Sequence, residues 1–181
     1  MKVLPPYWET ERLFIQDSSL AEADSLQEVF HACGGIESWD PTFRPELEEG
    51  FINLIARSQS GEPGIQTVFK MQTLYLKENR EIIGYFHLHH GLPKPKTVFI
   101  SMFIISPTYQ RQSYGQETVR GIITQLQNLG GFEKVWLNVH LKNWPALRFW
   151  IRAGFTSIVE FRGDPVNGDD SHALLILEKA L

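Results

Sequence analysis

The stretch from Phe103 to Gln116 constrains the fold most, because it passes from an apolar run through a polar loop into an amphipathic helix. Four apolar residues follow at the spacing of one buried helix face: Val119, Ile122, Ile123 and Leu126. Gly130 and Gly131 can end the helix, because glycine adopts left-handed backbone conformations. A loop that leads from a strand into a helix leaves backbone N–H groups unpaired, and the helix dipole adds partial positive charge. The stretch therefore predicts a site for a phosphate-like anion, although many such junctions bind nothing.

The composition indicates an ordinary globular protein. A chain of 181 residues with 43% hydrophobic and 21% charged residues suits one domain, residues 1–181. The net charge of -4 argues against a general nucleic-acid binder, which usually carries a basic surface. The one cysteine, Cys33, has no internal disulfide partner, which fits a reducing compartment. No apolar run approaches the ~20 residues of a membrane span and the N-terminus has no signal-peptide core, so we expect a cytoplasmic protein.

The order of apolar and turn segments predicts an α+β domain with a mixed sheet. We expect strands over 9–17, 66–77, 81–90, 97–105, 135–140, 155–161 and 172–177. We expect four helices: one after Ser18-Ser19, one over 45–58, the one after the polar loop, and one that Asn143 caps and Gly154 ends. The segment 97–105 is nearly all apolar and predicts a central strand that pairs in parallel across the following helix.

Two motifs and the chain's opening resemble the GNAT acetyltransferases. The family's acyl-CoA pyrophosphate loop has Arg or Gln, two residues, Gly, one residue, then Gly or Ala; Gln110 and Gly115 match its ends, and Ser113 stands where the middle glycine is usual. A second family pattern lies after the next strand, and the residues that match it are Asn143, Ala146, Phe149, Trp150, Gly154 and Phe155. The segment 10–13 resembles the start of the Rim-type (ribosomal-protein N-acetyltransferase-like) branch, so the resemblance covers nearly the whole chain.

The resemblance implies a GNAT-like mixed, mostly antiparallel sheet of about seven strands with about four helices. It also implies a splay between the fourth strand, 97–105, and the fifth, 135–140, where the pantetheine arm of acetyl-CoA would pair with the backbone of Phe103 and Ile105. The pyrophosphate would lie on the amides of 111–116. The cofactor-binding residues so implied are Phe103, Ile104, Ile105, Gln110, Arg111, Gln112, Ser113, Tyr114, Gly115, Gln116, Asn143, Ala146, Phe149 and Trp150.

The catalytic groups are less well matched. In many GNAT enzymes a tyrosine on the last helix protonates the leaving sulfur; that place is taken by Trp150, whose indole N–H has no usable acidity. A carboxylate on the fourth strand often serves as base, and the segment 97–105 contains none. The substitute candidates are His87, His89, Ser101 and Asn143. A histidine has a pKa of about 6.5, which suits proton transfer. Any single histidine is nevertheless more often a surface or satisfied core residue.

Other polar and aromatic residues allow weaker interpretations. A metal site from His87, His89 and His90 is disfavoured, because no carboxylate or cysteine is spaced to complete it, so we expect no metal. Trp39 and Phe43 can either cover a substrate pocket or belong to the core.

The resemblance implies an acetyl-CoA-dependent N-acetyltransferase that moves the acetyl group directly to a primary amine of a small molecule or a protein N-terminus. The alternative is an acyl-CoA-binding GNAT-fold module with little or no turnover, which the missing tyrosine and carboxylate suggest. Nucleotide binding without CoA would require a Walker-type Gly-Lys-Ser/Thr, which does not follow this loop. We expect acetyl-CoA and an amine as partners, no nucleic acid and no membrane, and a monomer or homodimer.

Overall fold

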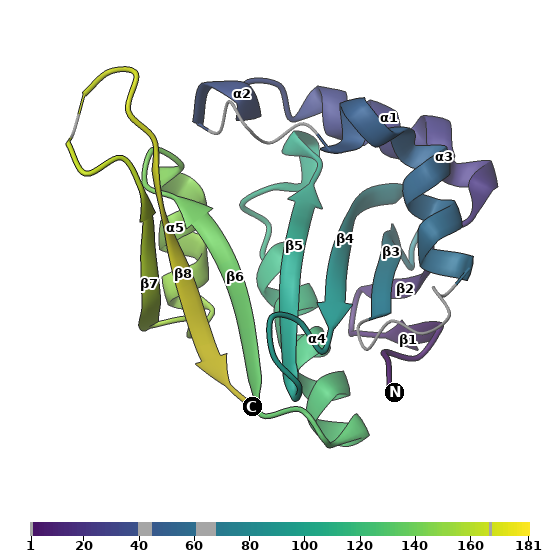
Figure 1. Cartoon of the computed structure of the whole chain (residues 1–181). Helices are drawn as coiled ribbons and strands as arrows, with labels where there is room; N and C mark the ends of the chain where they lie inside the picture. Colours follow the sequence, from purple (N-terminus) through teal and green to yellow (C-terminus); the bar gives the residue numbers. More distant parts are fainter. Residues whose placement is uncertain (1, 40–44, 61–67, 167) are drawn as a thin grey trace.

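A central β-sheet organises the protein, for which the computed structural model describes residues 2–39, 45–60, 68–166 and 168–181 (Figure 1). Its strands are β1 (Tyr7–Glu9), β2 (Leu13–Asp17), β3 (Val68–Leu76), β4 (Ile82–His90), β5 (Thr97–Ile105), β6 (Lys134–His140), β7 (Ser157–Gly163) and β8 (Ala173–Ala180). They are ordered β1-β2-β3-β4-β5-β6-β8-β7 across the sheet. The pair β5–β6 is parallel and the other neighbours are antiparallel, so the predicted α+β fold with a mixed, mostly antiparallel sheet is confirmed.

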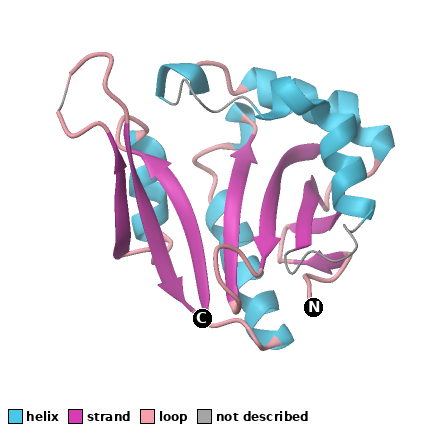
Figure 2. Ribbon diagram, in the orientation of Figure 1, coloured by secondary structure: helices cyan, strands magenta, loops and turns pink. Residues whose placement is uncertain are grey.

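Helices cover both faces of the sheet (Figures 1 and 2). They are α1 (Ala23–Ala32), α2 (Ile36–Trp39), α3 (Pro45–Ser60), α4 (Tyr114–Leu129) and α5 (Trp144–Arg152), with single 3-10 turns η1 (Leu20–Glu22) and η2 (Pro107–Tyr109). The apolar stripe of α4 packs with α5 in a core on one face, and α1 and α3 form a second core on the other. Gly130, with φ of 63°, ends α4 as predicted.

Two local predictions were wrong. The segment 9–17, expected as one strand, forms β1 and β2, because the chain turns between them. The Thr10 amide donates to the Leu13 carbonyl at 2.9 Å, and the Leu13 amide donates to Thr10 Oγ1 at 3.1 Å. The segment after Cys33 contains the short helix α2, which is absent from the four helices expected from the sequence. The sheet therefore has one strand more than the sequence pattern indicated.

The parallel pair β5–β6 separates partway along its length. The last register pair is Ile100 with Leu137. Beyond it β5 stays paired with β4 as far as Ile105, and β6 stays paired with β8 as far as His140. Both strands therefore continue, but away from each other, as Figure 2 shows. The predicted splay between these two strands is confirmed.

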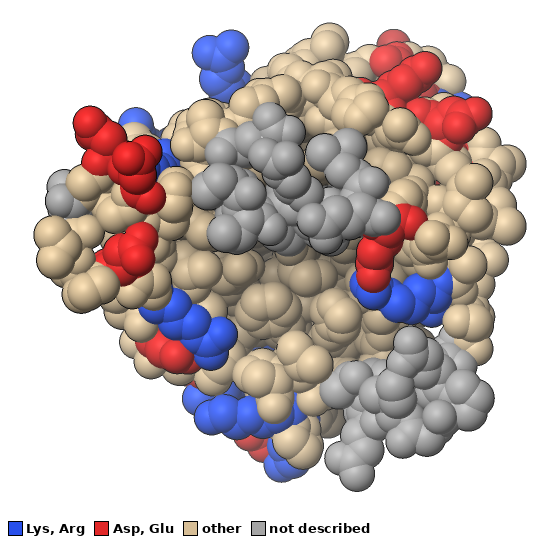
Figure 3. Space-filling model, turned by 45° about the horizontal axis from the view of Figure 1, so that its top comes forward, with Lys and Arg blue, Asp and Glu red and all other residues tan. Residues whose placement is uncertain are grey.

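Charged side chains are dispersed over the face of the molecule that Figure 3 shows. Figure 3 shows acidic and basic side chains around the rim of one face, with uncharged residues over much of its middle. None of the helices in the described ranges is long and apolar enough to span a membrane.

Candidate functional site

A cavity of about 840 Å³ opens where β5 and β6 diverge. One wall is the end of β5 with the loop that leads into α4, and another is α5. The end of α1 and the segment through α2 contribute the remaining side. All of the predicted cofactor-binding residues line this cavity except Gln112 and Tyr114. Its volume lies in the range of pockets that hold small molecules and cofactors.

The loop ahead of α4 presents backbone donors. Arg111 and Ser113 have left-handed backbones, with φ of 61° and 69°. Among the described residues, no acceptor bonds to the amides of Tyr114, Gly115 or Gln116, and the Ser113 side chain does not cap the helix. These amides lie at the positive end of the 16-residue helix α4. The arrangement suits an anion, which the backbone would bind without any change of conformation.

The two glutamine side chains of the loop bond to the loop itself. Gln110 Nε2 donates to the Ile105 carbonyl at 2.8 Å, and Gln112 Nε2 donates to the Thr108 carbonyl at 2.8 Å. Each side chain spans four or five residues of the same turn. Their structural role is therefore to hold the loop in shape, which leaves the backbone amides as its donors toward the cavity.

Packing as well as access favours a glycine at position 115. A Cβ atom there would lie 3.1 Å from Phe149 Cε2 and 3.5 Å from Phe103 Cε1. The Phe103 and Phe149 rings stack with centroids 5.8 Å apart, and the Trp150 ring meets them edge-on at 5.5 and 4.9 Å. The aromatic cluster thus joins β5 to α5 beneath the start of α4.

Asn143 caps α5, as predicted. Its Oδ1 accepts a hydrogen bond from the Ala146 amide at 3.1 Å, and Pro145 occupies the first turn, where a missing N–H costs nothing. The cap places the first turn of α5 along the cavity beyond the end of β6. Because the side-chain oxygen of Asn143 serves the cap, its side-chain nitrogen, Nδ2, is the group that remains for a ligand.

The described lining is electropositive. Arg111, Arg148 and Arg152 line the cavity, and no Asp or Glu does so among the residues that the structure describes. A concave site with one sign of charge concentrates ligands of the opposite sign. The charge agrees with the backbone amides in favouring an anionic ligand.

The predicted catalytic residues are not gathered at the cavity. Asn143 lines it, whereas His87, His89 and Ser101 do not. His87 is 3% exposed on β4 and packs against the rings of Phe69 and Tyr85, on the face that α1 and α3 cover. Burial, helped by the nearby charges of His89 and Arg57, lowers the pKa of His87 to about 3. Burial and Arg57 lower the pKa of His89 to about 4. Both rings are therefore neutral at pH 7, and a catalytic role for them stays a prediction.

Ser101 occupies an irregularity of β5. The register with β4 shifts between His87 and Leu88, so that Ser101 is the extra residue of a β-bulge. Its Oγ donates to the His87 carbonyl at 3.5 Å. The bulge lies one residue beyond Ile100, where pairing with β6 ends. Ser101 thus marks the start of the splay, and its catalytic role remains untested.

Among the lining residues that sequence reasoning missed are Cys33, from another part of the chain, and Tyr109, from the loop ahead of α4. Cys33, at the end of α1, donates its thiol to the Ile105 carbonyl at 3.7 Å, and burial raises the pKa of that thiol to about 11. Tyr109 lines the cavity, and a hydrogen bond with Glu81 together with burial raises its pKa to about 12. No local pattern signals either position, because each depends on contacts across the sheet. Trp39 also lines the cavity, and Phe43 lies outside the described residues.

Side-chain groups that bind metals are not clustered. In the described ranges, no three His, Cys, Asp or Glu side chains come close enough to hold a metal ion together.

The fold and motifs correspond to known proteins. The family model described as "Acetyltransferase (GNAT) family" matches residues 34–155. Among solved structures, an acetyltransferase from Thermus thermophilus has 18% identity and a TM-score of 0.68, covering 96% of this chain and 100% of that one. A GNAT-family acetyltransferase from Bacillus anthracis has 13% identity and a TM-score of 0.72, with 96% and 98% covered.

A third solved structure is similar over nearly its whole length. The Salmonella typhimurium acetyltransferase that modifies the N-terminal serine of a 50S ribosomal subunit protein has 13% identity and a TM-score of 0.73, with 95% and 96% covered. At these identities the likeness shows a common fold. None of the curated proteins is significantly similar to the chain.

Proposed function

Because the chain belongs to the acetyltransferase (GNAT) family, we propose that it moves the acetyl group of acetyl-CoA directly to a primary amine of a small molecule or a protein N-terminus. The observation that carries the proposal is the cavity beside the end of β5 that diverges from β6, which is bordered by α5 and by the amides at the start of α4. A thioester cofactor with a diphosphate needs both an extended slot and fixed anion donors.

The backbone of β5 offers groups for the pantetheine arm. The Ser106 amide donates to the Ile83 carbonyl at 2.8 Å, on the β4 side. The Ile105 carbonyl therefore points away from β4, toward the splay, and Phe103 shares that direction because strand groups alternate. The Ile105 carbonyl already accepts from Gln110 and Cys33. We accordingly assign the pairing with pantetheine to Phe103 and to the Ile105 amide.

The pyrophosphate would lie on the amides of 111–116. Three of these amides begin α4, and Arg111 lines the same part of the cavity. Backbone donors suit this task because they are fixed before the ligand arrives, which lowers the entropy cost of binding. Arg148 and Arg152, on the α5 wall, add positive charge for the remaining phosphate of CoA.

Direct transfer forms the amide bond between the amine nitrogen and the acetyl carbon while the carbon–sulfur bond breaks. The amine loses a proton and the thiolate gains one. A covalent route through Cys33 is disfavoured, because its raised pKa keeps the thiol protonated. The indole N–H of Trp150 is too weak an acid to protonate a thiolate, so we assign protonation of the sulfur to water in this protein.

The acceptor is proposed only as a class. The structurally similar Salmonella typhimurium enzyme acts on an N-terminal serine, and this chain has 13% identity to it. A panel of amines tests the class: a peptide with a free N-terminal serine, a polyamine and an aminoglycoside, each with acetyl-CoA. We expect free thiol to be released with at least one of them, above the rate without amine.

The alternative is an acyl-CoA-binding module with little or no turnover. It is favoured by Trp150 at the usual place of the acid and by the absence of Asp and Glu from the described lining. CoA binding measured by calorimetry, without thiol release from any amine in the panel, would support the module against the enzyme.

Substitution of Gly115 tests the assigned anion site. We expect Gly115→Asp to weaken CoA binding by about tenfold or more, because a carboxylate at the helix start repels the pyrophosphate. Gly115→Ala is the matched control, since it adds the Cβ that approaches Phe149 but no charge. Calorimetric titration of CoA into both variants measures the difference. Equal affinities of the two variants would contradict the site.

A further inference from the structure

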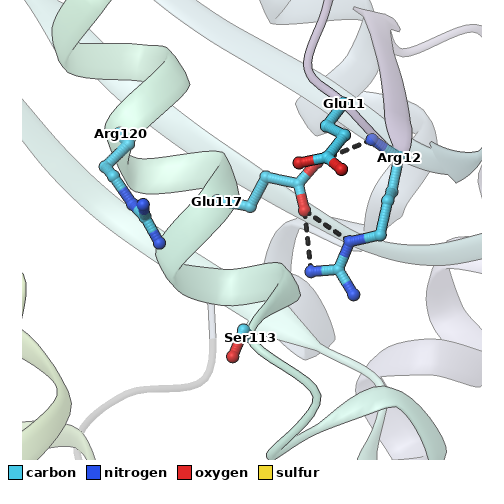
Figure 4. Close-up of a pocket in the computed structure, with 5 residues that line it drawn as sticks. All are labelled: Glu11, Arg12, Ser113, Glu117 and Arg120. Carbon is cyan, nitrogen blue, oxygen red and sulfur yellow. Dashed lines mark hydrogen bonds and ion pairs between the residues drawn. The ribbon is translucent and has the colours of Figure 1, made fainter.

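The turn between β1 and β2 contacts the loop of residues 110–116, which leads into α4, through Arg12 (Figure 4). The Arg12 guanidinium forms an ion pair with Glu117, with Nε and Nη2 both 2.7 Å from Oε2. Its Nη1 donates to the Gln112 carbonyl at 3.1 Å. The same guanidinium lies 4.1 Å from the ring centroid of Tyr114. One side chain thus contacts three residues of a six-residue segment, at least 100 positions away in the sequence.

Glu117 is held from the same turn by further bonds. The Arg12 amide donates to its Oε1 at 2.8 Å, and Thr10 Oγ1 donates to the same oxygen at 2.5 Å. Its side chain is 14% exposed. Burial raises the pKa of Glu117, but the hydrogen bonds from Thr10 and Arg12 outweigh burial, so the pKa lies below its ordinary value. The carboxylate is therefore ionised and bonded at neutral pH.

The loop needs support from outside itself. Arg111 and Ser113 both have left-handed backbones, which cost non-glycine residues energy. Ser113 makes no side-chain cap at the start of α4. The contacts of Arg12 lie on either side of this strained point, at Gln112 before it and at Tyr114 and Glu117 after it.

We propose that Arg12 is a positioning residue that holds the loop in the conformation that binds the cofactor's pyrophosphate. This inference rests on the proposed function. Arg12 is outside the lining of the main cavity, so it acts through Gln112, Tyr114 and Glu117. The Arg12 side chain is 40% exposed, and an ion pair with an exposed partner contributes little to global stability, so its loss is expected to change the loop rather than the fold.

The test compares Arg12→Gln, Arg12→Lys and Arg120→Gln. Arg120 lies on α4 and lines the same small hollow as Arg12, but its side chain donates to the Gln116 carbonyl of its own helix. Figure 4 shows its side chain apart from the Arg12–Glu117 pair, with no dashed line between them. Arg120→Gln therefore removes one positive charge near the loop but keeps the contacts of Arg12 with the loop.

For Arg12→Gln we expect the Kd of CoA and the KM of acetyl-CoA to rise about tenfold, with kcat at saturating acetyl-CoA within about twofold of wild type. Arg12→Lys keeps the charge but loses the planar guanidinium, which donates to Glu117 and Gln112 at once, so it should recover only part of the affinity. The expected rise for Arg120→Gln is smaller than for Arg12→Gln. Equal rises would show that charge alone acts, and unchanged affinity in Arg12→Gln would also overturn the proposal.

A second measurement separates this inference from the proposed function. If the wild-type protein does not bind CoA, the proposed function fails, and hydrogen exchange of the Glu117 amide, which donates to the Ser113 carbonyl at 3.0 Å in the free protein, still tests Arg12. Faster exchange of this amide in Arg12→Gln than in Arg120→Gln supports the positioning role. Equal exchange in the two variants overturns it.

Discussion

Ser113 shows how one residue can strain a binding loop. With φ of 69° and ψ of 2°, it has the left-handed conformation that glycine adopts freely. We expect Ser113→Gly to raise the free energy of unfolding by about 0.5–1 kcal/mol, because relief of the strain exceeds the added entropy of the unfolded chain. Urea unfolding measures the change.

Ser106 provides the matched control. It precedes the 3-10 turn η2 with φ of -49°, a conformation open to any residue, and it makes no side-chain cap. Ser106→Gly is therefore expected to lower stability by about 0.5–1 kcal/mol. A loss of stability in both variants would show that the backbone at Ser113 is not strained.

Trp150 combines a core position with a place on the cavity wall. It is 6% exposed and packs edge-on against Phe155 at 5.2 Å as well as against Phe103 and Phe149. We expect Trp150→Tyr to have a kcat about tenfold above that of Trp150→Phe, because a phenol can protonate the leaving thiolate. The two variants leave nearly the same space in the core and differ by one hydroxyl. Equal kcat values from thiol-release assays would show that water protonates the sulfur unaided.

At the scale of elements, β4 carries neutral histidines into the sheet's interior. Burial lowers the pKa of His87 to about 3. Burial also lowers the pKa of His90 to about 4, although a hydrogen bond with the Val68 backbone raises it in part. His89 is lowered to about 4 by burial and Arg57. The unfolded chain therefore binds more protons than the folded one below pH 6.5, and stability present above that pH is lost as the pH falls.

Each of these histidines is expected to lower the free energy of unfolding by up to about 1.4 kcal/mol per pH unit below pH 6.5. In His87→Gln one titrating group is gone, so the decline between pH 6.5 and 5 should be shallower, even if the variant is less stable overall. Urea unfolding at several pH values gives the two slopes. An identical slope in the variant would contradict the buried, neutral state of His87.

At the scale of the whole molecule, the splay divides the sheet into β1–β5 and β6–β8-β7, which share four register pairs between β5 and β6. A ligand in the cavity would contact the first part through β5 and the second through α5, which connects β6 to β7, and should stabilise them together. We expect CoA at a hundredfold excess over its Kd to raise the free energy of unfolding by about 2.7 kcal/mol. Thermal unfolding with and without CoA measures this shift.

Hydrogen exchange locates the same effect. The amides of 114–116 lack acceptors among the described residues, and we expect CoA to slow their exchange far more than that of the amides within α1. Stabilisation by CoA without protection of these amides would place the ligand elsewhere.

The local features of this protein could be read from its sequence. The strand-loop-helix segment, the Gly130 stop and the Asn143 cap all occur where residue spacing placed them, because each depends on neighbours within a few positions. The family resemblance, rather than residue spacing, pointed to many of the lining residues, which lie on the end of β5, the loop that follows it and α5. The break between β1 and β2 was missed although its turn is local, because the apolar pattern does not reveal that the Leu13 amide donates to Thr10 Oγ1 there.

By itself, the sequence determined the order and type of the main elements, through hydrophobic periodicity and turn residues that act over short distances. Only the tertiary structure decided that β8 lies between β6 and β7, that Cys33 and Trp39 reach the cavity, and that His87 is buried away from it. It also decided that Arg12 is tied to Gln112 and Glu117. The physical reason is that such contacts join residues far apart in the chain, and they form only when the apolar faces of the elements pack together.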